Sequence, residues 1–261
     1  MKPREFIDQL GRKLVLNDKP RRIVSLVPSQ TELLNDLGMD ESVVGITKFC
    51  IHPTEWFESK VRVGGTKNVN IERVKALNPD LILANKEENT KEDIALLEEI
   101  APVWISDINS FEDALNMIRS VGELLGIEAS AEKQITEITR AFSSAAIQSR
   151  ISALYFIWKD PDYCAGKGTF ISSMLEKAGF INVCESPRYP EVGTFDMSQP
   201  EYILLSTEPY PFKEKDRDEY TNRYPNAKVI VVDGEMFSWY GSRMRLAATY
   251  FKQLQHQIGR N

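Results

Sequence analysis

The chain has 261 residues, of which 42% are hydrophobic and 27% are charged, so it has enough apolar material for one large or two small domains, which argues against disorder. Its 32 basic and 38 acidic residues give a formal charge of -6, which argues against nucleic acid or anionic lipid as a partner. Three cysteines are too few and too far apart for a disulfide scaffold or a metal knuckle, and no run approaches the roughly 20 apolar residues of a membrane span.

Short β-rich runs alternate with helical patterns through the first half of the chain. Strands are predicted over 23–27, 43–47, 81–84 and 103–106, and helices over 29–37 and 111–125. Such alternation predicts a parallel sheet wound with helices, so residues 1–127 are expected to form an amino-terminal α/β lobe. After the first strand, Ser29 and Glu32 have the S-x-x-E spacing of a capping box.

Residues 128–150 form a polar segment with apolar positions at three- and four-residue spacings and no Gly or Pro. A helix of that length would span about 30 Å, which is enough to join two lobes as a rigid bridge. The alternative is one more surface helix within a single large sheet.

The second half repeats the α/β pattern. Strands are predicted over 151–158, 202–206 and 229–232, and helices over 169–178 and from 242 onward. Residues 151–261 are therefore expected to form a carboxyl-terminal α/β lobe, which makes the whole chain two Rossmann-like lobes joined by one long helix.

Cys50 and His52 follow the strand at 43–47, and open α/β folds bind ligands on loops after strand ends. Either side chain could bind a metal axially, but two ligands do not make a zinc site. The alternative is a structural cysteine beside a hydrogen-bonded surface histidine. Gly64 and Gly65 permit either a tight turn or the close approach of a flat ligand.

Aromatic residues gather after the strand at 229–232. Trp239 and Tyr240 could form a platform for a broad planar ligand, and Arg243 could hold its carboxylate or phosphate group. The alternative is packing in the core and at a helix start, which we prefer for Phe237.

Several motifs then resemble the periplasmic cobalamin-binding and iron-chelate-binding proteins of ABC importers. In chain order they are residues 20–33 (PRRIVSLVPSQTEL), 45–47 (GIT), 63–65 (VGG), 70–74 (NIERV) and 77–82 (LNPDLI). Residues 165–171, 178–183 and 200–205 agree less tightly. The resemblance implies two α/β lobes bridged by a long helix, with the ligand in a cleft between the lobes.

The resemblance also implies a set of site residues. The ligand would be contacted by Phe49, Cys50, His52, Gly65, Thr66, Lys67, Tyr189, Trp239, Tyr240 and Arg243. Cys50 and His52 would be the candidate axial ligands of a metal. Glu32 matches the first of the two acidic residues through which relatives dock on a permease.

The expected function is therefore the capture of a metal chelate, namely a corrinoid such as cobalamin, a haem or an iron-siderophore, by a monomer that has no intrinsic cofactor and catalyses no reaction. The expected partner is an ABC transporter permease. The location would be periplasmic or in the cell envelope if a leader was removed, and cytoplasmic if Met1 is native. Two alternatives remain open: a cytoplasmic chelate sensor or carrier without a transporter, and an enzyme that uses Cys50 on a metal chelate.

Overall fold

The computed structural model describes residues 3–145, 147 and 149–259, and the chain divides into two compact units. Unit 1 comprises Met1–Ile108, Glu112–Ile138 and Tyr240–Arg243, and unit 2 comprises Asn109–Phe111, Thr139–Trp239 and Met244–Asn261. The chain thus returns to unit 1 close to its carboxyl end. In the described part of the chain, none of the helices is long and apolar enough to cross a membrane.

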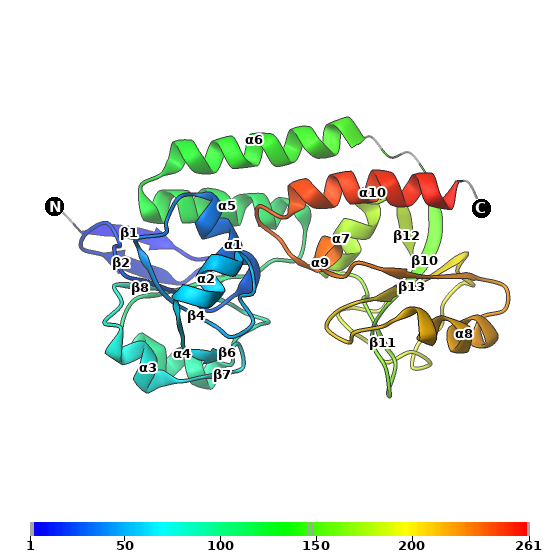
Figure 1. Cartoon of the computed structure of the whole chain (residues 1–261), viewed down its shortest axis with the longest axis horizontal. Coiled ribbons are helices and arrows are strands. Elements are labelled where there is room, and N and C mark those ends of the chain that lie inside the picture. Colours follow the sequence, from blue (N-terminus) through cyan, green and yellow to red (C-terminus); the bar gives the residue numbers. More distant parts are fainter. Residues whose placement is uncertain (1–2, 146, 148, 260–261) are drawn as a thin grey trace. The chain divides into compact units, whose positions relative to one another are not determined.

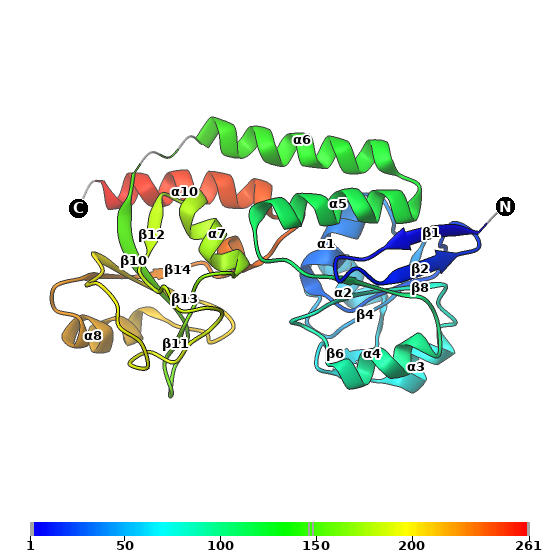
Figure 2. The same cartoon turned by 180° about the vertical axis from the view of Figure 1, so that it is seen from behind.

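Unit 1 contains a five-stranded parallel sheet in the order β5-β4-β3-β8-β9. The strands are β3 (Ile23–Ser25), β4 (Val43–Ile46), β5 (Val61–Arg62), β8 (Leu81–Asn85) and β9 (Val103–Ser106). The helices are α1 (Pro28–Asp36), α2 (Thr54–Ser59), α3 (Ile71–Ala76), α4 (Lys91–Glu98) and α5 (Phe111–Leu125). Helices α3 and α4 lie on one side of these strands and α5 on the other (Figures 1 and 2).

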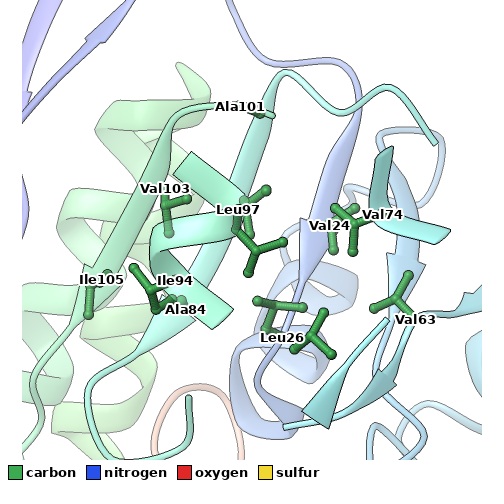
Figure 3. Packing of buried hydrophobic residues seen from close by; sticks show 12 residues of the cluster. Val24, Leu26, Val63, Val74, Ala84, Ile94, Leu97, Ala101, Val103 and Ile105 are labelled. Atoms are coloured by element: carbon green, nitrogen blue, oxygen red, sulfur yellow. The ribbon is translucent and has the colours of Figure 1, made fainter. Parts of the chain in front are cut away.

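The core of unit 1 follows from the two-residue period of its strands. Ile82 and Ala84 of β8 point to the same face as Val103 and Ile105 of β9, and all four are buried. Figure 3 shows that Ile94 and Leu97 of α4 pack against this face. Because the opposite face is buried as well, β8 is an apolar run without alternation, as in parallel sheets covered on both sides.

Two antiparallel hairpins accompany the sheet. The first joins β1 (Arg4–Ile7) to β2 (Lys13–Leu16), and the second joins β6 (Gly64–Gly65) to β7 (Asn68–Val69). At the turn of the β1-β2 hairpin, the Asp8 carboxylate accepts hydrogen bonds from the backbone amides of Leu10 (3.0 Å) and Arg12 (2.8 Å). The sequence analysis did not predict this hairpin.

Unit 2 contains a second sheet in the order β11-β10-β13-β14, with β12 also paired to β10. Its strands are β10 (Ile151–Trp158), β11 (Tyr163–Cys164), β12 (Phe180–Asn182), β13 (Tyr202–Ser206) and β14 (Lys228–Val232). Only the pairing of β11 with β10 is antiparallel among those described. The helices are α7 (Phe170–Lys177), α8 (Glu214–Arg223), α9 (Glu235–Ser238) and α10 (Met244–Ile258). The mixed α/β fold with parallel sheets confirms the predicted fold class.

Helix α6 (Glu128–Ala145) begins where the sequence predicts it and buries Ala131, Ile135 and Ile138. The chain passes from unit 1 to unit 2 after Ile138, within this helix. The helix is shorter than the predicted 128–150. Positions 146 and 148 lie outside the described residues, and the described residues 147, 149 and 150 are not helical, because the chain must straighten before β10 begins at Ile151.

Candidate functional site

The carboxyl edge of the unit 1 sheet carries the first group of predicted residues. Because β3, β4, β8 and β9 are parallel, the loops that follow them meet at one edge. Residues 47–53 follow β4, residues 86–90 follow β8, and the start of α1 follows β3. We call this the carboxyl edge of unit 1.

The loop after β4 presents apolar surface to solvent. Phe49 is 50% exposed and Ile51 is 44% exposed. The ammonium group of Lys48 lies 5.0 Å from the centre of the Phe49 ring. His52 is partly exposed on the same loop. Exposed apolar side chains beside a polar one make this loop a candidate surface for a mostly apolar ligand.

Cys50 occupies a different environment from its two neighbours. Its side chain is fully buried, and its sulfur lies 3.1 Å from the hydroxyl of Thr31 and 3.2 Å from that of Thr47. Burial raises the pKa of the thiol above its ordinary value, whereas the two hydroxyl groups lower it. The thiol is therefore held in its protonated form inside unit 1, away from solvent.

The β6-β7 hairpin brings Thr66 and Lys67 to the same edge. The backbone oxygen of Thr66 accepts a hydrogen bond of 2.8 Å from the side chain of Asn89, in the loop after β8. Burial raises the pKa of the neighbouring Glu88 carboxyl, and the Lys67 charge and the Thr66 hydroxyl counteract this. A Cβ atom on Gly65 would lie 3.3 Å from the Phe49 ring, so this glycine lets the ring approach the backbone.

Tyr240 and Arg243 also belong to unit 1, but both are largely buried. The Arg243 guanidinium donates from Nε (2.8 Å) and Nη2 (2.7 Å) to the two carboxylate oxygens of Glu32 on α1. The side chains are only 8% and 15% exposed. This bidentate pair binds the returning segment Tyr240–Arg243 to α1, so the guanidinium and the carboxylate are both used inside the fold.

The predicted capping box at Ser29 is wrong. Helix α1 begins at Pro28 after Val27, and no side chain caps it, so Ser29 lies within the first turn. Proline suits the first helical position because it has no amide hydrogen to satisfy there. The Glu32 carboxylate is turned to Arg243 rather than to the helix start.

The carboxyl edge of the unit 2 sheet, formed by the ends of β10, β13 and β14, carries a second aromatic group. Trp158 ends β10 and is 43% exposed, and its ring packs edge-on against Tyr210 with 5.8 Å between the centroids. Trp239 is largely buried. Tyr189 is partly exposed, and the guanidinium carbon of Arg188 lies 5.5 Å from its ring centre.

Glu208 lies among these aromatic residues at the end of β13. Its carboxylate accepts a hydrogen bond from the hydroxyl of Ser238, and the Trp239 side chain also bonds to it. Burial and, to a smaller extent, the nearby charges of Glu235 and Asp233 raise the pKa of this carboxyl to about 7, against the lowering effect of the two hydrogen bonds. The group therefore changes charge near neutral pH.

The structure brings Phe49, Gly65, Thr66 and Lys67 together at one edge and adds Glu88, which the sequence analysis missed. It also adds Glu208 beside Trp239. Both glutamates follow a predicted strand within a few residues, which is the signal that could have found them. Within the described residues, no three His, Cys, Asp or Glu side chains gather to hold a bare metal ion.

Comparison with known proteins assigns a family to this fold. The family model described as periplasmic binding protein matches residues 23–218. The ABC transporter substrate-binding lipoprotein YvrC of Bacillus subtilis is 31% identical over 180 residues, which cover 64% of this chain and 57% of the relative. The chain thus spans little more than half the length of that relative.

Two further proteins are similar over most of the chain. The vitamin B12-binding protein of Pectobacterium carotovorum subsp. carotovorum (strain PC1) is 28% identical over 242 residues, covering 88% of this chain and 86% of the relative. The solved structure of the petrobactin-binding protein YclQ from Bacillus subtilis superposes with a TM-score of 0.80 at 15% identity, covering 97% of this chain and 98% of that one. At this identity, the second similarity shows the fold alone.

Proposed function

Because this chain belongs to the periplasmic binding protein family, we propose that it captures a metal chelate for import by an ABC transporter. The ligand class is a corrinoid, a haem or an iron-siderophore. The protein acts by binding and needs no reaction or intrinsic cofactor of its own. Its place of action is the cell envelope, and its partner is a transporter permease.

The observation that carries this proposal is the exposed apolar surface at the carboxyl edge of each sheet. Phe49 and Ile51 supply it in unit 1, and Trp158 with Tyr210 supplies it in unit 2. Apolar side chains that are exposed together on loops at the carboxyl ends of strands suit a ligand-binding surface. A planar or chelated metal complex offers the large apolar area that would match them.

Polar groups at the same edges would orient the ligand. In unit 1 these are His52, Thr66, Lys67 and Glu88, and in unit 2 they are Tyr189 and Glu208. His52 is the proposed axial ligand, since a neutral imidazole nitrogen binds cobalt and iron well. Cys50 and the Glu32–Arg243 pair are left out of this site because they are bonded inside unit 1.

An absorption titration tests the proposal. The purified protein is titrated with cobalamin, cobinamide and haem, and ferric siderophores are tested by equilibrium dialysis. We expect a saturable one-to-one spectral change with one of the tetrapyrroles, and the axial component of this change should be lost in His52→Ala. Failure of every chelate to bind would overturn the proposal.

The chain provides a matched control for the axial ligand. It has two histidines, and the second, His256, lies in the last turn of α10 in unit 2. His256→Ala should leave the spectrum of the complex unchanged. Equal loss in both variants would show that neither imidazole coordinates the metal specifically.

Aromatic variants test the contribution of each unit separately. Phe49→Ala in unit 1 and Trp158→Ala in unit 2 should each weaken binding by about tenfold or more, since truncating a buried aromatic contact costs on the order of 1–2 kcal/mol. Leu246→Ala is the control, because Leu246 is 54% exposed and belongs to helix α10 rather than to a loop that follows a strand. Weakening by only one of the two aromatic variants would restrict the site to that unit.

A further inference from the structure

Two of the three cysteines lie next to each other in unit 2, although 20 positions separate them in the sequence. Cys164 ends β11, and Cys184 follows β12. Their sulfur atoms are 3.5 Å apart, and both side chains are completely buried. The third cysteine, Cys50, lies in unit 1, where its sulfur contacts the hydroxyl groups of Thr31 and Thr47.

The backbone holds both cysteines in place on the same side of β10. Strand β11 pairs with the end of β10 through Phe156 and Cys164, and β12 pairs with its start through Ala153 and Asn182. The Asn182 carboxamide oxygen then accepts a hydrogen bond of 3.1 Å from the amide of Cys184. A disulfide has sulfur atoms about 2.0 Å apart, so the two sulfur atoms would have to approach each other by about 1.5 Å to form one.

We infer that Cys164 and Cys184 are a disulfide-forming pair, and that the bond joins β11 to the segment after β12 when the protein folds in an oxidising compartment. Membership of a family of envelope proteins supports the compartment, because disulfides form and persist there. The inference does not depend on which ligand the protein binds.

The chemistry is a thiol–disulfide exchange with a small disulfide such as oxidised glutathione or with a dithiol oxidase of the same compartment. One protein thiolate attacks the oxidant's disulfide, forms a mixed disulfide and releases one thiol. The second protein thiol then attacks the mixed disulfide and releases the other. The protein loses two hydrogen atoms, and the oxidant is reduced to two thiols.

Burial determines when this exchange can occur. It raises the pKa of both thiols above the ordinary value; the neighbouring Cys184 sulfur raises the pKa of Cys164 further, whereas the hydrogen bond with Cys164 lowers that of Cys184. Thiolates are therefore scarce in the folded state, and the bond should form while the chain folds rather than afterwards. Once formed, it would be shielded from reductants in solution.

The bond would stiffen a segment with a role in the proposed site. Residues 186–191 run beside β11, where the Cys164 amide donates to the backbone oxygen of Pro190 (3.1 Å) and Gly166 donates to that of Arg188 (2.7 Å). This segment carries Tyr189. The segment that carries Tyr189 begins just after Cys184 and is hydrogen-bonded to the backbone at Cys164. A bond between the two cysteines would therefore restrain this segment, and the position of Tyr189 would depend on the redox state of the pair.

The decisive measurement is a count of free thiols in the full-length protein. The wild type is refolded in a buffer of reduced and oxidised glutathione, then unfolded in the presence of an alkylating reagent and analysed by mass spectrometry with peptide mapping. We expect one alkylated cysteine, Cys50, and one cross-linked peptide that contains Cys164 and Cys184. After reduction all three cysteines should be alkylated.

Three variants act as matched controls. Cys50→Ser should keep the cross-link and lose the single alkylation, whereas Cys164→Ser and Cys184→Ser should each lose the cross-link and show two alkylated cysteines. In the wild type, the oxidised form should unfold about 5 °C or more above the reduced form, because the bond closes a loop of 20 residues in the unfolded chain. Three free thiols after oxidative refolding, glutathione adducts in place of the cross-link, or a bond to Cys50 would each overturn the inference.

Discussion

Glu208 is a carboxyl group whose charged form is disfavoured in the folded state. Its pKa is about 7 in the fold, against an ordinary value of 4.5. Because the folded pKa is the higher one, the folded state binds the proton more tightly, and the resulting stabilisation is complete below pH 4.5 and is lost as the pH rises through 7. The charge at this position therefore costs stability at alkaline pH.

The substitution Glu208→Gln should remove the contribution of this carboxyl group to the pH dependence of the free energy of unfolding. We expect the free energy of unfolding of the wild type to fall relative to the variant by about 2 kcal/mol between pH 4.5 and pH 8, after an allowance for partial exposure. Urea unfolding of both proteins across this pH range measures the difference in their free energies of unfolding. If the two stability curves ran parallel, the carboxyl would not have a raised pKa.

Glu201 in the same unit gives a control of the opposite sign. Its exposed carboxylate accepts hydrogen bonds from the amide (2.9 Å) and the hydroxyl (3.0 Å) of Ser152, and these lower its pKa. Its contribution to stability is present above the ordinary pKa and is lost as the pH falls through the lowered one. Glu201→Gln should therefore differ from the wild type at neutral pH and converge with it in acid.

Individual site residues could be predicted from the sequence only where a motif pointed to them. The double glycine at 64–65 and the run at 49–52 were visible because glycine, thiol and imidazole groups stand out after a strand. Glu88 and Glu208 could not be predicted, because a single glutamate in a loop is not distinguished from other glutamates by sequence. Only its burial in the fold sets it apart. The bond from Arg243 to Glu32 spans 211 positions, which no local pattern reports.

At the scale of elements, the Glu32–Arg243 pair fastens α1 to the segment before α10. Since both side chains are largely buried, removing one partner leaves an uncompensated charge, so we expect Glu32→Gln or Arg243→Gln to lower stability by about 3 kcal/mol. The double variant should lose less than the sum of the two. Chemical unfolding of all four proteins measures this coupling energy, and strict additivity would contradict a direct role of the pair.

The β6-β7 hairpin depends on one glycine and not on the next. Gly64 has a φ of +112°, and a Cβ there would lie 2.5 Å from the backbone oxygen of Asn68. At Gly65 the nearest neighbour would be the movable Phe49 ring at 3.3 Å. Gly64→Ala should therefore lower stability by about 2 kcal/mol or more, and Gly65→Ala by less than about 1 kcal/mol. Thermal unfolding of both variants compares them, and equal losses would contradict this account.

Most long elements could be predicted because their periodicity is strong. Helix α5, strand β9 and strand β13 have the predicted bounds, since apolar spacing and flanking polar residues agree there. The short elements, such as the β1-β2 hairpin and β12, were missed because three or four residues are too few to show a period. They are fixed by partners that lie elsewhere in the chain.

At the scale of the whole molecule, the part of the chain that follows Ile138 returns to unit 1 only for Tyr240–Arg243. A fragment that ends after Ile138 would therefore lack the partner of Glu32. We expect this fragment to be less stable than unit 1 in the intact protein, and Glu32→Gln to recover part of the loss, because it removes the unpaired charge. Urea unfolding with and without this substitution tests it. No recovery would mean that the loss has another cause.

The chain's four tryptophans, all among the described residues, differ in their contact with solvent. Trp104 is fully buried, Trp56 and Trp239 are 3% and 8% exposed, and Trp158 is 43% exposed at the end of β10. Acrylamide in solution should therefore quench the emission of Trp158 first, and the remaining emission should shift to shorter wavelength. A coloured chelate bound near this ring would absorb the same light, so the molecule carries its own optical reporter of occupancy.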